Sequence, residues 1–138
     1  MLDWFVNHVQ HTTFASNVMW AVAALVAGLV MLRSVWRLRH ERPDYWYTML
    51  GVALVALPTA VQRAFWGVWT WYLAHGQEAA AAAWAAQKGF LTPLVFIIVL
   101  GYGFHIRALV QTKTRHWAAV IVGLPVTVYF TALFFVSM

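Results

Sequence analysis

The chain has 138 residues, of which 63% are hydrophobic and only 9% are charged. Soluble domains average about 45–50% apolar and about 25% charged residues, so this composition excludes an ordinary soluble protein and indicates an integral membrane protein. The net charge of +5 comes mostly from arginine clusters between apolar runs, which indicates membrane topology rather than nucleic-acid binding. Cysteine is absent, which excludes disulfide frameworks and thiolate metal sites. We predict a single transmembrane domain over residues 1–138.

The first residues of the chain are mildly amphipathic, and we expect an interfacial helix over residues 2–11. His8 and His11 lie three residues apart in it, a spacing that a metal ion can use. Because no carboxylate or third histidine follows nearby, we interpret both as interfacial polar residues.

The first predicted span covers residues 14–32, a run without a charged residue that is long enough to cross a bilayer. Small residues recur in it at four-residue spacing, Ala23 with Ala27 and Ala24 with Gly28. This spacing allows helix backbones to approach closely, so it predicts a packing face.

The second predicted span covers residues 45–66 and begins with three aromatic residues, which is typical of a membrane interface. Arg63 lies about 18 residues along this helix, roughly 27 Å at about 1.5 Å per residue. The hydrocarbon core is about 30 Å thick, so we expect Arg63 near the outer interface. Tryptophans are expected to anchor the spans at the two interfaces: Trp46, Trp66, Trp69, Trp71 and Trp117.

Two further spans follow a short alanine-rich segment. Residues 77–87 are too few, and too polar at their ends, to cross a bilayer, so we expect a second interfacial helix there. The third span covers residues 92–110 and opens with Thr92 and Pro93, an N-cap residue and a proline in the first turn. The fourth span covers residues 117–136.

The basic residues predict the orientation of these spans. Two inner loops carry most of them, and the outer side carries only Arg63 and Lys88. Because short basic loops stay in the cytoplasm, we expect an all-α, four-helix membrane bundle of the bacterial inner membrane with both termini on the periplasmic side. The residues that set this topology are Arg33, Arg37, Arg39, Arg42, Arg107, Lys113 and Arg115.

Several kinds of chemistry find no support in the sequence. The chain resembles the small multidrug transporters in the number and length of its spans, but its first span has no glutamate, and all four acidic residues lie outside the predicted spans. No two histidines share one depth on different spans, so we predict no haem and interpret His105 as an interfacial histidine. Hydrolase and phosphate-binding motifs are also missing. We therefore predict no enzyme, catalytic residue, cofactor, metal, nucleic-acid partner or small-molecule substrate.

Arg63 allows two interpretations. It is either a cation that lines a polar path, beside Gln62 and above Pro58, or an interfacial arginine that extends toward water among tryptophans and stacks on Trp66. The calculated depth favours the second interpretation.

In its overall plan the chain resembles small bacteriophage holins, which are short, multi-span and rich in small and aromatic residues, with basic inner loops. The resemblance covers all four spans and includes no diagnostic motif. It implies accumulation in the inner membrane, self-association into a homo-oligomer, and opening of the membrane to a lysis enzyme. Two alternatives stay open: an accessory subunit of a larger membrane complex, and a small phage exclusion or immunity protein.

The holin-like hypothesis assigns residues to two roles. The faces for helix packing and self-association are Ala23, Ala24, Ala27, Gly28, Ala119 and Gly123. The polar groups that face an aqueous lesion are Gln62, Arg63, Thr127 and Thr131. The bilayer, another copy or another membrane protein are the expected partners.

Overall fold

The computed structural model describes residues 13–40, 43–111 and 117–136, and within these residues every regular element is a helix. The all-α class is therefore confirmed. The described residues form five α-helices: four long ones and a shorter one in the alanine-rich segment, where a second interfacial helix is expected. The expected helix over residues 2–11 lies outside the described residues. The elements are α2 (Phe14–Leu38), α3 (Pro43–Ala74), α4 (Glu78–Ala85), the 3-10 turn η1 (Lys88–Leu91), α5 (Thr92–Gln111) and α6 (Trp117–Val136).

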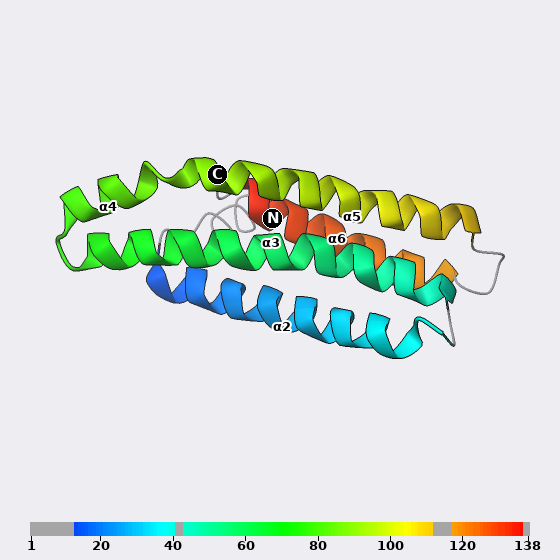
Figure 1. The fold of residues 1–138 in the computed structure, drawn as a ribbon. Coiled ribbons are helices and arrows are strands. Elements are labelled where there is room, and N and C mark those ends of the chain that lie inside the picture. The colour runs from blue at the N-terminus through cyan, green and yellow to red at the C-terminus, as the bar shows by residue number, and fades with distance from the viewer. Residues whose placement is uncertain (1–12, 41–42, 112–116, 137–138) are drawn as a thin grey trace, which may run out of the picture.

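Helix α3 is the centre of the bundle. It contacts α2, α5 and α6, and Figure 1 shows α2 and α5 on opposite sides of it with α6 alongside. In its most apolar stretch 67% of the residues are buried, against 11% in α2, so the outer helices turn most of their apolar surface outward. The buried apolar core combines residues of four helices: Ala24, Val55, Ala56, Ala60, Ile98, Phe130, Leu133 and Phe134.

Three helical stretches are long and apolar enough to cross a membrane, namely Phe14–Leu38, Trp46–Ala74 and Lys88–Val110. They indicate a membrane protein, in agreement with the composition. The apolar stretch found in α6, Ile121–Phe135, is shorter.

Local sequence signals account for the helix ends. The side chain of Thr13 caps α2 by accepting a hydrogen bond from the backbone N–H of Ser16 at 3.4 Å. Pro43 occupies the first position of α3, where its missing N–H is not needed. Gly76 follows α3 with φ of 68°, a left-handed conformation that glycine adopts without strain.

Helix α3 extends beyond the expected span, and α4 packs back onto its end. The helix continues through Pro58 and past residue 66 to Ala74, and Figure 1 shows α4 beside this last part. The indole Nε1 of Trp84 donates a hydrogen bond of 2.8 Å to the carbonyl oxygen of Phe65, and the two rings stack with centroids 5.2 Å apart. One partly buried indole thus connects α4 to α3.

Each neighbouring helix approaches α3 closely where a glycine leaves room. A Cβ atom on any of these glycines would lie less than 3.0 Å from the facing atoms. The close contacts are Gly28 against Leu57, Gly51 and Gly101 against each other, and Gly123 against Thr48.

These contacts correct part of the predicted self-association faces. Ala24, Gly28 and Gly123 are buried within the chain, so a second copy cannot reach them while the bundle is closed. Ala23 is exposed and Ala27 is partly buried against the core. The side chain of Ala119 lies outside the described part of α6. Four-residue spacing of small residues identifies a packing face without saying whether the neighbour belongs to the same chain.

Candidate functional site

The interior of the bundle contains a row of polar side chains that runs along the contact between α3 and α6. Tyr102 and Thr131 are partly buried, and every other member is at most 4% exposed. The row, referred to below as the polar seam, consists of Asn17, Thr48, Thr59, Gln62, Arg63, Tyr102, His105, Thr127 and Thr131.

Helical periodicity explains why these residues meet. Gln62 and Arg63 lie three and four residues after Thr59 on α3, and Thr127 and Thr131 are four residues apart on α6. Residues at these spacings share one face of a helix, and the two faces are turned toward each other. Both helices therefore place polar groups inside the bundle rather than toward its surroundings.

Arg63 joins three helices at one end of the seam. Its Nη1 donates to Oδ1 of Asn17 on α2 at 3.3 Å, and its Nη2 donates to the carbonyl oxygen of Leu133 on α6 at 3.1 Å. The Nε2 of Gln62 donates to the carbonyl oxygen of Phe134. We refer to Asn17, Gln62, Arg63 and these two carbonyl groups as the clasp.

The clasp binds the last described turn of α6. The carbonyls of Leu133 and Phe134 lie in this turn. In an apolar environment such groups must be satisfied by other protein groups. Gln62 and Arg63 supply the donors, and in doing so they hold α6 to α3.

The interpretation of Arg63 as an outward-facing interfacial anchor is wrong. Its side chain is 1% exposed and points into the bundle. Helix α3 continues for about three further turns beyond it, so Arg63 does not lie at the end of its helix. Counting residues places Arg63 at a height along α3, but it does not determine the face of the helix on which the Arg63 side chain lies.

Hydroxyl groups continue the seam below the clasp. The hydroxyl of Thr59 lies within hydrogen-bond distance of two carbonyl oxygens, and its one hydrogen can be shared between them. They belong to Val55, at 2.9 Å, and to Phe130, at 3.0 Å. The Oγ1 of Thr131 donates to the carbonyl oxygen of Thr127 at 2.8 Å, and the hydroxyl of Tyr102 lies 2.8 Å from Oγ1 of Thr131. These bonds link α3 and α5 to α6.

His105 occupies the other end of the seam and is buried, which corrects its assignment as an interfacial histidine. Its side chain is 0% exposed, and its Nε2 lies 2.6 Å from Oγ1 of Thr127. The ring lies over Gly51, where a Cβ would come within 2.8 Å of it. Within the described residues, Nδ1 of His105 and Oγ1 of Thr48 have no hydrogen-bond partner. Gly51 thus leaves space for the imidazole, and Thr127 supplies its hydrogen-bond partner.

The structure brings together all four residues predicted to face a polar path, since Gln62, Arg63, Thr127 and Thr131 belong to the seam. Sequence reasoning did not select Asn17 or Thr59. The sequence positions of both residues could have identified them. Asn17 is the one amide in the first predicted span, and Thr59 lies one helical turn before Gln62 and Arg63.

Basic residues gather at the end of the bundle away from the clasp, where α2 and α5 end and α3 begins (Figure 1). Arg39 lies over the ring of Trp36 at 3.5 Å, and Arg107 lies 5.0 Å from the ring of Tyr47. Arg33 and Arg37 are exposed on the last turns of α2. Arg42, Lys113 and Arg115 lie outside the described residues, so the predicted loop topology remains a prediction.

The predicted tryptophan anchors lie near both ends of the long helices. Trp46 stacks on Tyr47 with ring centroids 4.0 Å apart, and Trp66 meets Trp69 edge to face at 5.5 Å. Trp71 is exposed at 39%. The side chain of Trp117 lies outside the described part of the chain. In the described ranges, no group of three or more histidine or acidic residues could hold a metal ion.

No family model, curated protein or solved structure matches this chain. The polar seam and its burial are therefore the observations from which a function must be argued.

Proposed function

We propose that the chain is a four-span protein of the bacterial inner membrane, with both termini on the periplasmic side, that self-associates and permeabilises the membrane as holins do. The three long apolar helices and the apolar stretch of α6 support this arrangement, as does the excess of arginine in the two loops expected inside. The clasp would then lie toward the outer surface, and the basic end of the bundle would lie inside.

The polar seam is the observation that carries the proposal. An ionisable residue inside a membrane bundle is expensive to bury, and such residues usually mark a path for ions, water or substrate. Arg63 is buried at 1% exposure, and further buried amide, hydroxyl and imidazole groups lie in the same bundle interior. A bundle that needed only packing could fill this space with apolar side chains.

Helix α6 is the element whose movement would open the seam. It contributes Thr127, Thr131 and the carbonyls of Leu133 and Phe134, and these groups face donors on α3 and α5. Moving α6 away would separate polar groups from one another and expose them to water. The permeable state would therefore be lined on both sides by groups that are already polar.

The surfaces of α2 and α5 suit self-association within a bilayer. Their exposed residues are almost entirely apolar, and they include Val22, Val26 and Leu29 on α2 and Phe96, Val99 and Leu100 on α5. Neighbouring copies could cover these faces with little polar desolvation, while the basic ends of the helices stay at the interface.

Expression of the chain in bacteria is expected to cause an abrupt loss of membrane potential after a lag, measured with a potential-sensitive dye. The double variant Thr59→Val and Thr127→Val keeps side-chain shape but removes two hydroxyls of the seam, so it should slow the loss. The matched control Val126→Thr and Val128→Thr changes exposed positions on α6 and should leave the time course unchanged. Continued growth with intact potential, while the protein is present in the membrane fraction, would contradict permeabilisation.

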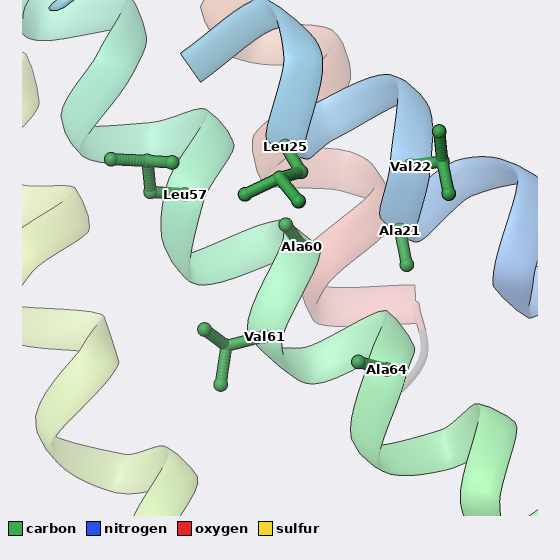
Figure 2. A pocket seen from close by; sticks show the side chains of 7 residues that line it. All are labelled: Ala21, Val22, Leu25, Leu57, Ala60, Val61 and Ala64. Atoms are coloured by element: carbon green, nitrogen blue, oxygen red, sulfur yellow. The ribbon is translucent and has the colours of Figure 1, made fainter. Parts of the chain in front are cut away.

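A groove between α2 and α3 favours a second candidate function, that of an accessory subunit in a larger membrane complex. Figure 2 shows the small and branched apolar side chains that line it. Its volume is about 280 Å³, and its lining consists of Ala21, Val22, Leu25, Leu57, Ala60, Val61 and Ala64. The ridge of another apolar helix would fit such a groove. Under this alternative, extraction in mild detergent would recover the chain with an unrelated partner in fixed stoichiometry.

A further inference from the structure

We infer that the seam selects small inorganic anions such as chloride over cations, and that the clasp is the binding point. This inference rests on the proposed permeation through the seam and names the ion that would pass. It follows from the sign of the charge at the clasp, from buried indole donors on the same helix faces, and from a pocket with a positive charge one helical turn away.

The fixed charge of the seam is positive. A guanidinium stays protonated in proteins, so Arg63 is a cation in any state of the bundle. The four acidic residues of the chain are Asp3, Glu41, Asp44 and Glu78, and none of them belongs to α5, to α6 or to α3 beyond its first turn. No carboxylate side chain on these helices therefore offers a cation a site along the seam.

Two indole N–H groups on the helices of the clasp lack acceptors among the described residues. Trp20 follows Asn17 by three residues on α2, and Trp66 follows Arg63 by three residues on α3, so each shares a helix face with its clasp residue. The Nε1 atoms of both are buried and have no hydrogen-bond partner among the residues that the structure describes. An indole N–H can only donate. Anions accept hydrogen bonds from such groups, whereas cations cannot.

A pocket lies beside Trp66, one helical turn along α3 from Arg63. Its volume is about 180 Å³, and it is lined by Trp66, Lys88, Gly89, Leu91 and Thr92. Lys88 adds a second positive charge at this pocket. Positive charges around a cleft with apolar walls raise the local concentration of anions and lower that of cations.

The clasp can exchange its partners for an anion. When α6 moves away, the N–H groups of Arg63 and Gln62 lose the carbonyl oxygens of Leu133 and Phe134. A chloride ion that enters the same place would accept hydrogen bonds from these N–H groups, which would take the place of part of its hydration shell. Basic side chains commonly give anion pores their selectivity in this way.

The test compares ion fluxes in liposomes that contain the purified full-length chain. Chloride entry is followed with an internal fluorescent chloride indicator, and potassium efflux is followed with an ion-selective electrode. We expect chloride to pass at least about tenfold faster than potassium, since a buried charge acts strongly on an ion a few ångströms away. Arg63→Gln should lower the ratio toward one, and Arg63→Lys should preserve it.

Asn17→Asp keeps the test informative if Arg63→Gln does not fold. It places a carboxylate where Oδ1 now lies 3.3 Å from Nη1, so it strengthens the contact while cancelling the charge, and the chloride preference should fall. Arg37→Gln, which removes an exposed arginine, is the matched control and should leave the ratio unchanged. Flux without chloride preference would overturn this inference and leave the proposed function intact, whereas absence of any flux would overturn both.

Discussion

Replacing Arg63 with methionine is expected to lower the free energy of unfolding of the bundle by about 2 kcal/mol. The change leaves the carbonyl of Leu133 and the Oδ1 of Asn17 without this donor, and an unsatisfied buried polar group costs about 1–3 kcal/mol. Part of this loss is offset because the variant no longer buries a cation. We expect the loss to be larger than the gain, since Arg63 bonds to two other helices and both of these contacts are lost.

The unfolding of Arg63→Met is measured by titrating the detergent-solubilised protein with SDS and following tryptophan fluorescence. Arg33→Met is the control, because it makes the same chemical change at an exposed position and should alter the free energy by no more than about 0.5 kcal/mol. If Arg63→Met is as stable as the wild type, the clasp does not hold α6 in place.

Gly51→Ala is expected to destabilise the contact between α3 and α5 by about 2 kcal/mol, within the range for overpacking of a core. The added methyl group would lie 2.9 Å from the carbonyl oxygen of Gly101 and 2.8 Å from the ring of His105. The backbone of α5 cannot rotate away as a flexible side chain could, so the two helices must separate. Because His105 lies in the same contact, its hydrogen bond to Thr127 should lengthen as well.

The same SDS titration compares Gly51→Ala with Gly103→Ala. Gly103 is exposed on α5, and a Cβ there would meet nothing within 4 Å. Its replacement should therefore leave stability unchanged or raise it by up to about 1 kcal/mol through helix propensity. Equal effects of the two substitutions would show that α3 and α5 do not pack at Gly51.

Much of the helical framework could be predicted from the sequence. The spans expected at residues 92–110 and 117–136 correspond to α5 and α6 within one residue. Helices α2 and α3 extend beyond the first two expected spans, α2 to Leu38 and α3 to Ala74. Those predictions were guided by the thickness of a bilayer, whereas a helix can continue into the interface wherever its backbone hydrogen bonds and a neighbour such as α4 support it.

The face on which each polar residue lies could not be predicted in the same way. Depth along a helix follows from counting residues, but burial depends on how neighbouring helices rotate around α3. For Arg63 the decisive neighbours are Asn17 and the last turn of α6, which are far from it in sequence. For His105 the decisive feature is the space left by Gly51. The spacing of the residues predicted a polar face on the helix. The packing of the neighbouring helices determines that this face is buried.

The central claim is that the polar seam becomes the water-filled path of the permeable state. The chain contains no cysteine, so a single introduced thiol reports on one position without background. The most direct measurement is the reaction of Thr59→Cys with a membrane-impermeant, charged thiol reagent during flux from liposomes. Val128→Cys on the exposed face of α6 is the control. We predict that Thr59→Cys reacts only while the membrane is permeable and that its modification blocks the flux. Treatment of Val128→Cys with the same reagent should leave the flux unchanged. Undiminished flux with an unmodified Thr59→Cys would contradict the claim.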